Sequence, residues 1–217
     1  RIFPPEEKKL RHLISNYYGM ISLIDHNVGR IMTSLNELGI AENTLVVFTA
    51  DHGELLGDHG LLLKGPFIYE SLLRVGCIMR GPNIPRNRII EDPISTLDIP
   101  ATFYDYANIT KPMELNGKSL TGLIHNKENR DFAYNEWDLR SSRTGLELDL
   151  RVARTKGAKL IFEETSEAGE LYILSEDPGE MDNVFNDPAY AKIQKELMDM
   201  IKSRPNDAIP KLDQVGM

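Results

Sequence analysis

The residues of this chain that could do chemistry gather in the loop after one short apolar run. Residues 45–48 are apolar and rich in β-branched and aromatic residues, which predicts a buried strand, and Asp51 and His52 lie just beyond its end. In open α/β sheets, ligands collect beyond the carboxyl ends of strands. A carboxylate beside an imidazole suits a divalent cation. We therefore consider Asp51 and His52 as metal ligands; in the alternative, the Asp51 carboxylate accepts backbone N–H groups and only caps the loop.

Two more polar residues follow within a dozen positions. His59 stands in a second polar cluster, residues 57–60, and could be a ligand, a general acid or a loop residue hydrogen-bonded to Asp58. Lys64 follows three leucines, which would hold its stem while the ammonium meets an anion, or it is an ordinary surface lysine. The sequence contains no Gly-x-Ser-x-Gly elbow, glycine-rich phosphate loop or Cys-x-x-Cys pair, so these residues do not identify a nucleophile.

The elements that would position these residues alternate between helix and strand. Apolar residues recur at three- and four-residue spacing up to Gly39, which predicts a long helix that covers a sheet, with Asp25 as a buried or half-buried polar anchor. The order that follows is a strand at 45–48, a short helix at 67–73, a buried strand at 75–79 that contains an inert Cys77, and a helix near 97–104. This alternation favours an α/β layered sheet.

The second half of the chain has a different pattern of predicted elements. Short strands are predicted at hairpin-like spacing, and Asp187 with Pro188 begins a terminal helix; the strands lie near 132–134, 148–152, 159–162 and 171–174. We therefore predict an α/β domain over residues 1–110. A carboxy-terminal α+β subdomain, a small antiparallel sheet with a final helix, is predicted over 111–217.

Composition narrows the class of protein. The chain has 217 residues, 41% hydrophobic residues and a formal net charge of −8 without a basic block, which excludes a disordered chain and argues against a nucleic-acid partner. No apolar run approaches membrane-spanning length, so we expect a soluble protein that does not use the membrane. The chain begins without Met, so we expect a piece of a longer protein. Its compartment (periplasmic, secreted or cytoplasmic) and oligomeric state stay open.

Four stretches in this order resemble the carboxy-terminal half of the sulfatase family, within the alkaline-phosphatase-like superfamily: residues 17–31, 43–54, 57–75 and 170–183. The resemblance implies that Asp51 and His52 are two ligands of an active-site divalent cation, with Ca²⁺ favoured and Mg²⁺ or Mn²⁺ as alternatives. It also places Lys64 on the sulfate or its bridging oxygen. His59 receives no role from the resemblance and is kept as a candidate substrate contact.

The chain departs from the family at its nucleophile. That nucleophile is a formylglycine made from Cys or Ser in a Cys/Ser-x-Pro/Ala-x-Arg motif. Cys77 is followed by Ile78, Met79 and Arg80, so it lacks this motif. We therefore expect the formylglycine and the remaining acidic metal ligands upstream, in a missing amino-terminal half.

Three functions follow from these observations. The first is a metal-dependent sulfuric ester hydrolase acting on a small sulfate ester or a sulfated saccharide, active in full-length form and inactive as this fragment. The second is a phosphonate monoester or phosphodiester hydrolase, because the Asp-His pair also occurs in superfamily members that act on phosphonate monoesters or choline sulfate. The third is a binding module without catalysis.

Overall fold

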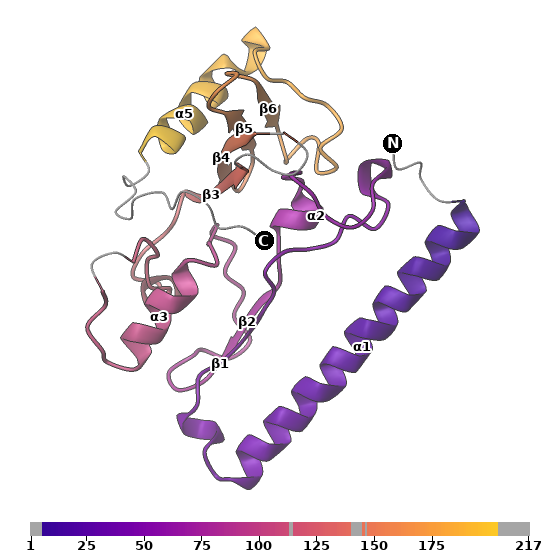
Figure 1. Ribbon diagram of the computed structural model, residues 1–217. Coiled ribbons are helices and arrows are strands. Elements are labelled where there is room, and N and C mark those ends of the chain that lie inside the picture. Colours follow the sequence, from indigo (N-terminus) through magenta and orange to yellow (C-terminus); the bar gives the residue numbers. More distant parts are fainter. Residues whose placement is uncertain (1–5, 113–114, 140–144, 146, 204–217) are drawn as a thin grey trace. The chain divides into compact units, whose positions relative to one another are not determined.

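The structure is a computed structural model that describes residues 6–112, 115–139, 145 and 147–203 (Figure 1). The chain divides into two compact units, Arg1–Arg86 and Asn87–Met217. The division into an α/β domain over residues 1–110 and a carboxy-terminal subdomain over 111–217 stays a prediction. The first unit carries the candidate chemical residues, and the second carries the larger sheet.

The first unit opens with the long helix that the apolar spacing predicted, α1 (Glu7–Glu37). An acidic residue in the first turn favours this end of a helix, and Gly39, at φ 68°, follows its last turn. None of its residues is buried, so the prediction that it covers a sheet is wrong for the described residues. Asp25 is exposed, and its role as a buried anchor is wrong too. The apolar stripe lacks a covering layer there, and it leaves these large side chains exposed: Leu13, Tyr18, Met20, Ile21, Leu23, Ile24 and Ile31.

The two strands of the first unit pair with each other. After the 3₁₀ turn η1 (Ala41–Asn43), β1 (Val46–Thr49) runs antiparallel to β2 (Cys77–Arg80). Both strands were predicted, but as buried strands. Phe48 and Ile78 are directly opposite in this register, so they share a face, and they are 40% and 66% exposed. The prediction of burial is wrong here because one face of this two-stranded sheet is open.

Between β1 and β2 lie the short helices η2 (Asp58–Gly60) and α2 (Glu70–Leu73). Three buried hydrophobic side chains anchor this segment: Leu55, Ile68 and Leu72. They are the buried hydrophobics in the described part of the first unit. The buried hydrophobic side chains of this unit therefore lie in the loop that carries the candidate chemical residues and in the segment around α2.

The second unit begins with α3 (Asp98–Tyr106) and α4 (Thr121–Ile124). The Asp98 carboxylate is buried and accepts hydrogen bonds from the backbone N–H groups of Ser95 and Lys118, at 2.8 and 2.9 Å. It also meets the Arg130 guanidinium at 2.5 Å. These contacts fasten the start of α3 to the segment before α4.

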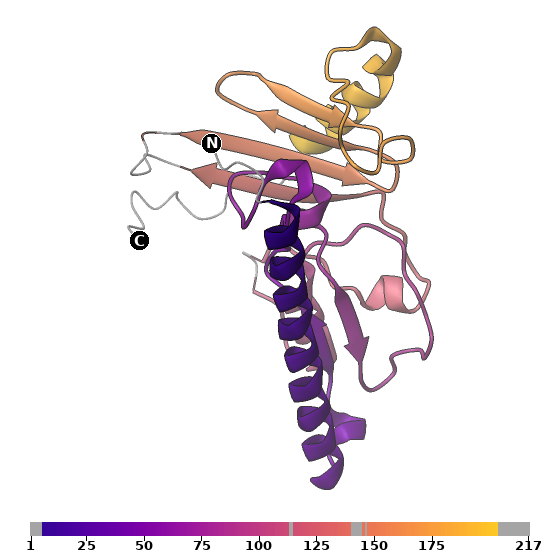
Figure 2. The same ribbon diagram turned by 90° about the vertical axis from the view of Figure 1, so that its right-hand side faces the viewer.

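A four-stranded antiparallel sheet follows in the order β3-β4-β5-β6, built from β3 (Phe132–Leu139), β4 (Leu148–Thr155), β5 (Lys159–Glu163) and β6 (Gly169–Tyr172). The helix α5 (Ala191–Lys202) follows the 3₁₀ turn η3 (Pro188–Tyr190), and Figure 2 shows it beside the strands. Asp187 caps this turn, as the sequence predicted, by accepting from the Ala189 N–H at 2.9 Å. The core joins α5 to one face of the sheet through these buried residues: Ala153, Ala158, Leu160, Leu171, Ile173, Leu197 and Ile201.

The fold is therefore a mixture of helices and strands with two small antiparallel sheets and a terminal helix, which agrees with the expected fold class. In the part of the chain that the structure describes, none of the helices combines the length and the apolar character needed to cross a membrane.

Candidate active site

Gly53 fixes the start of the loop that carries the candidate residues. Its N–H donates to the Leu72 carbonyl at 2.8 Å. A Cβ on Gly53 would lie 1.9 Å from the carbonyl oxygen of Ser71. Only a residue without a side chain lets the backbone approach α2 this closely. The base of the loop is therefore seated on the carboxyl end of α2.

Beyond Gly53 the chain folds back on itself like a hairpin. The Leu55 N–H donates to the Leu63 carbonyl at 3.1 Å, and the Gly57 N–H donates to the Leu61 carbonyl at 2.8 Å. Gly57 has a φ of 109°, a value that glycine adopts readily. The antiparallel return brings Lys64 back to the base of the loop, near the residues that precede Gly53.

Lys64 and His52 meet at this base. The Lys64 ammonium lies 2.7 Å from His52 Nε2. On the other side of the ring, His52 Nδ1 lies 2.7 Å from the Gly53 carbonyl oxygen. A carbonyl can only accept, so Nδ1 carries the proton, and Nε2 presents a lone pair to the ammonium. A backbone carbonyl that fixes the tautomer in this way is the arrangement that proteins use to orient a histidine ligand for a metal.

Asp51 adds a carboxylate to the same corner. Its Oδ2 lies 3.5 Å from His52 Nε2, and its side chain is 86% exposed. The His52 N–H donates to Asp51 Oδ1 at 3.0 Å, so the loop-capping alternative describes a contact that is present. Backbone hydrogen bonds from the N–H groups of His52 and Asp51, together with the nearby positive charge of Lys64, lower the pKa of the Asp51 carboxyl. The carboxylate is therefore ionised, and Oδ2 points toward the same space as Nε2.

The described residues provide too few ligands at this corner to hold a metal ion. The described residues contain no group of three or more His, Cys, Asp or Glu side chains that could hold an ion together. Asp51 Oδ2 is an oxygen donor of the type that Ca²⁺, Mg²⁺ and Mn²⁺ prefer, and His52 Nε2, 3.5 Å away, is a nitrogen donor that could occupy a second position of a coordination shell. A complete shell needs oxygen donors from beyond the described residues.

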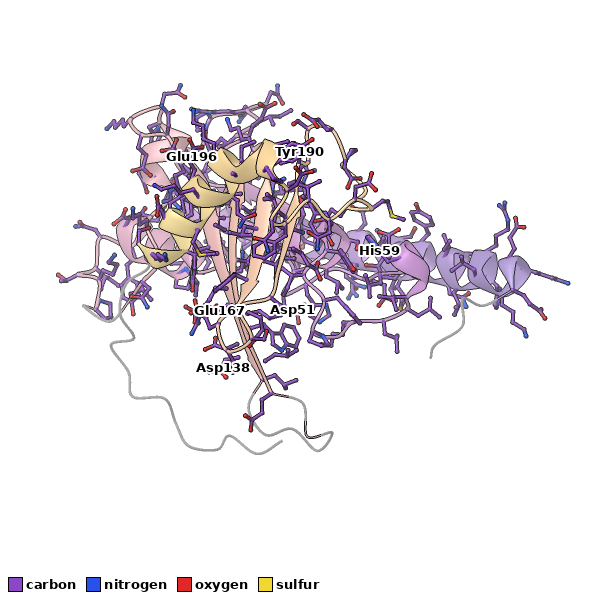
Figure 3. The ribbon with its side chains drawn as sticks, turned by 90° about the horizontal axis from the view of Figure 1, so that it is seen from above. Asp51, His59, Asp138, Glu167, Tyr190 and Glu196 are labelled. Atoms are coloured by element: carbon purple, nitrogen blue, oxygen red, sulfur yellow. The ribbon has the colours of Figure 1, made fainter. Side chains whose placement is uncertain are left out.

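His59 lies away from this corner, at the tip of the loop; Figure 3 labels it together with Asp51. Its backbone has a φ of 52°, in the left-handed region. Its ring stacks on Tyr69 with 3.7 Å between centroids and 9° between planes. Phe67 stacks on Tyr69 in turn, with 6.3 Å between centroids. Of the four candidates, the structure thus joins Asp51, His52 and Lys64, and it gives His59 a ring partner.

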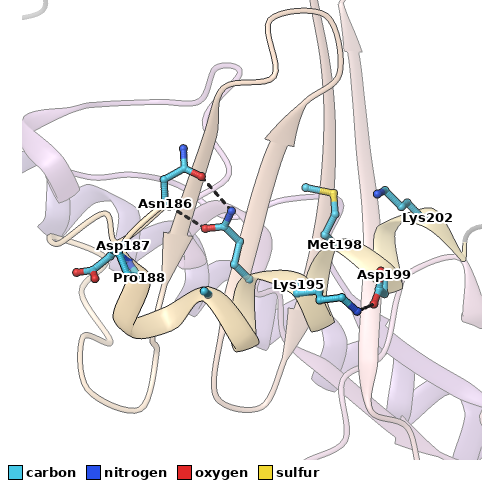
Figure 4. A pocket seen from close by; sticks show the side chains of 9 residues that line it. Asn186, Asp187, Pro188, Lys195, Met198, Asp199 and Lys202 are labelled. Atoms are coloured by element: carbon cyan, nitrogen blue, oxygen red, sulfur yellow. Dashed lines mark hydrogen bonds and ion pairs between the residues drawn. The ribbon is translucent and has the colours of Figure 1, made fainter.

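A cysteine and a surface groove lie apart from this corner. Cys77 is half-buried on β2, and burial raises the pKa of its thiol, which agrees with an inert cysteine. A groove of about 380 Å³ in the second unit runs along α5 and contains none of the four candidates (Figure 4). Its lining consists of Asn186, Asp187, Pro188, Ala191, Gln194, Lys195, Met198, Asp199 and Lys202.

Sequence reasoning missed the residues that seat the loop. Gly53 was singled out neither for its close approach to α2 nor for its hydrogen bond to Leu72. Tyr69 lies within the stretch 57–75 that carries the resemblance, but its stacking against His59 was not predicted. A glycine directly after two candidate ligands, and an aromatic residue just before a short helix, were the available signals.

The family comparison gives this geometry its context. The family model "Sulfatase" matches residues 1–109, which is half of the chain. The model of the carboxy-terminal domain of N-sulphoglucosamine sulphohydrolase matches residues 57–207. Together they cover residues 1–207, which include all of the described residues.

Individual relatives of the chain carry sulfatase names, in agreement with the family model. An N-acetylglucosamine-6-O-sulfatase of Bacteroides thetaiotaomicron is 31% identical over 89% of this chain and 36% of its own length. An arylsulfatase of Clostridium perfringens is 30% identical over 90% of this chain and 40% of its own length. The chain thus spans little more than a third of these curated relatives.

Two solved structures have the same fold. A 2-O GAG sulfatase superposes with a TM-score of 0.82, at 26% identity, over 92% of this chain and 44% of that one. A phosphonate monoester hydrolase of Agrobacterium radiobacter superposes with a TM-score of 0.80, at 31% identity, over 89% of this chain and 41% of that one. Such neighbours have the alkaline-phosphatase-like fold, and the matching models assign the chain to one family. This chain belongs to the sulfatase family.

Proposed function

We propose that this chain supplies part of the active site of a metal-dependent sulfuric ester hydrolase. The observation that carries the proposal is the meeting of Lys64 with His52 at 2.7 Å, beside the Asp51 carboxylate. The membership of the sulfatase family supports it. The cluster presents the two types of group that hydrolysis of a sulfate ester needs: donors for a cation and a positive charge for the leaving oxygen.

Each residue has a distinct role. Asp51 Oδ2 and His52 Nε2 would hold the divalent cation, with Ca²⁺ favoured and Mg²⁺ or Mn²⁺ as alternatives. When bound, this ion supplies a Lewis acid that stabilises negative charge on the ester. Lys64 binds the sulfate or its bridging oxygen and stabilises the charge that develops as the S–O bond breaks.

One consequence follows from the shared lone pair. His52 Nε2 has a single lone pair, and in this structure the Lys64 ammonium lies on it. If Nε2 held a cation, this lone pair would no longer accept from Lys64, and the ammonium would be available to a negatively charged group of the substrate. We therefore expect His52 Nε2 to serve either Lys64 or a cation, and not both at once.

The nucleophile has to come from residues beyond this chain. Cys77 is half-buried and lacks the formylglycine motif. We expect the formylglycine and the remaining acidic ligands from the amino-terminal part of the same protein. Alone, the 217 residues should be inactive.

The proposal is tested in the longer protein that carries both parts. Asp51→Ala and Lys64→Ala should each reduce aryl sulfate turnover by about 10²- to 10³-fold, the range for loss of one charge-stabilising group. Lys192→Ala, which alters a lysine side chain that is 90% exposed, is the matched control and should keep full turnover. Unchanged far-ultraviolet circular dichroism excludes unfolding. Full activity in both site variants would contradict the assignment.

A sulfated saccharide is the substrate class that we favour. The support is the name of one relative, N-acetylglucosamine-6-O-sulfatase, which covers 89% of this chain. Turnover of a glucosamine 6-O-sulfate above that of a simple aryl sulfate would support the saccharide. A preference for the aryl ester would favour a small sulfate ester.

A phosphonate monoester hydrolase is the second candidate. The observation that favours it is the superposition on such an enzyme of Agrobacterium radiobacter at 31% identity. Measuring sulfate and phosphonate esters on one preparation separates the two functions, because kcat/KM ranks them directly. A non-catalytic binding module, the third candidate, predicts that neither ester is hydrolysed even with the amino-terminal part present.

A further inference from the structure

The loop that carries Lys64 is attached to the segment around α2 at two separate points. At its base, the Gly53 N–H donates to the Leu72 carbonyl at 2.8 Å. At its tip, the His59 ring stacks on Tyr69, the residue before the first turn of α2. The four residues of α2 therefore span the gap between the two ends of the hairpin.

The tip contact is a close one. The His59 and Tyr69 centroids are 3.7 Å apart and their planes differ by 9°. Phe67 extends this stack: the centroids of the Phe67 and Tyr69 rings are 6.3 Å apart, and their planes differ by 11°. The ring of His59 at the hairpin tip and the rings of Tyr69 and Phe67 beside α2 form an aromatic stack that we call the 59–67–69 stack.

The loop needs such an anchor because its backbone is unfavourable. Leu56, His59 and Leu63 have φ values of 47°, 52° and 64°, in the left-handed region that non-glycine residues adopt at a cost. Conformations of this kind persist where surrounding contacts determine them. Between Gly53 and Lys64, the backbone bonds close the hairpin, and the stack fixes where its tip lies.

We propose that His59 is a positioning residue for Lys64. Its ring, seated on Tyr69, holds the hairpin against α2 so that the ammonium of Lys64 reaches the corner formed by His52 and Asp51. The role of His59 is that of a flat ring, and it touches neither the ester nor the cation. The catalytic consequence rests on the proposed function, whereas the structural one does not.

Variants at His59 and Tyr69 distinguish the contribution of ring stacking from that of the imidazole nitrogens and the backbone conformation. His59→Asn keeps a residue that tolerates the left-handed conformation but removes the ring. His59→Phe keeps a flat ring and removes the imidazole nitrogens. Tyr69→Phe keeps the stacking surface of the partner, and Tyr69→Leu removes it. All four are compared with the parent by circular dichroism, so that a variant that fails to fold is replaced by its counterpart on the other ring.

The first measurement is spectroscopic and needs no turnover. In ¹⁵N-labelled protein, the Nε2 resonance of His52 reports the hydrogen bond from Lys64. We expect His59→Asn and Tyr69→Leu to shift this resonance, and His59→Phe and Tyr69→Phe to leave it in place. An unshifted resonance in both ring-deleting variants overturns the proposal. A shift in His59→Phe equal to that in His59→Asn also overturns it, because the imidazole and not the ring would then matter.

The second measurement is kinetic, in the longer protein. His59→Asn should lower kcat for an aryl sulfate by roughly 10²-fold, the loss expected from a misplacement of about 1 Å, with a small change in KM. His59→Phe should restore most of kcat. Where the resonances shift as expected and no protein hydrolyses any sulfate ester, the proposed function fails and the positioning role stands. Where turnover is normal in both ring-deleting variants, the positioning role fails and the proposed function stands.

Discussion

The ammonium nitrogen of Lys64 lies 2.7 Å from Nε2 of His52, a contact between residues twelve positions apart. The opposite ring nitrogen faces the Gly53 carbonyl, so the lone pair on Nε2 is directed at Lys64. Under the proposed function, a cation and this ammonium would compete for the lone pair of Nε2.

Replacing Lys64 with Met should raise the affinity of the chain for Mn²⁺. The change removes a positive charge beside the site and frees the Nε2 lone pair, so we expect an increase on the order of tenfold. Isothermal titration calorimetry of the 217-residue chain measures it. Lys192→Met, at a 90% exposed side chain, is the control and should leave the affinity unchanged. Equal affinities for parent and Lys64→Met would refute the competition.

The 217-residue chain should bind Ca²⁺ weakly and hydrolyse no sulfate ester. Two donors, Asp51 Oδ2 and His52 Nε2, are too few for a cation that takes six to eight oxygen ligands. We expect a Kd weaker than about 10⁻⁴ M. Calorimetry and an aryl sulfate assay check both halves. Tight stoichiometric binding would show that the chain completes the shell by itself.

Gly53→Ala should destabilise the loop and its unit. The new Cβ would lie 1.9 Å from the Ser71 carbonyl oxygen, so the backbone must move; overpacking of this kind costs about 1–3 kcal/mol. Thermal unfolding measures the loss. Gly29→Ala is the matched control, because a Cβ at Gly29 in α1 has nothing within 4 Å and should stabilise the helix by about 0.5–1 kcal/mol. Two variants with the same melting temperature would contradict the close approach.

Asp98→Ala should be among the most damaging single changes in the second unit. It leaves the Arg130 guanidinium and the N–H groups of Ser95 and Lys118 without the carboxylate that they share. Removing one partner of a buried ion pair costs about 3–5 kcal/mol. Denaturant unfolding gives the value. Glu128→Gln, at the exposed end of Arg130, serves as the comparison and should cost less than about 1 kcal/mol.

The Glu163 carboxyl should lose its contribution to stability in acid. The hydroxyl and the N–H of Ser166 donate to it and lower its pKa from 4.5 to about 2. A carboxyl with a depressed folded-state pKa stabilises the fold above its unfolded pKa, and this contribution disappears as the pH falls from about 4.5 to about 2. Ser166→Ala should raise the pKa and flatten the pH dependence of unfolding between those values. An unchanged carboxyl titration of Glu163, followed by nuclear magnetic resonance, would refute this origin of the shift.

Periodicity in the sequence was a sound guide to the elements. The apolar spacing before Gly39 predicted α1, and the hairpin spacing after residue 132 predicted four strands that are present. The Asp187-Pro188 pair predicted the cap that Ala189 completes. Such patterns are local, since a helix or a hairpin is decided by residues a few positions apart.

Burial was the weaker part of the prediction. The stripe of α1 was expected to cover a sheet, and its residues are exposed within the described chain. Phe48 and Ile78 were expected inside a layered sheet, and they share an open face. An apolar pattern says which face of an element would be covered, but the covering layer has to come from elsewhere in the fold.

By itself, the sequence determined the types of group at the site: a carboxylate and an imidazole side by side, and a lysine twelve positions on. Only the tertiary structure decided which of them meet. The backbone hydrogen bond between Leu55 and Leu63 closes a hairpin, and Gly53 allows the base of this hairpin to contact α2. As a result, Lys64 reaches His52, and the ring of His59 stacks on Tyr69. The physical reason is that a loop's path is set by backbone hydrogen bonds and close approaches between distant residues, which the spacing along the chain does not record.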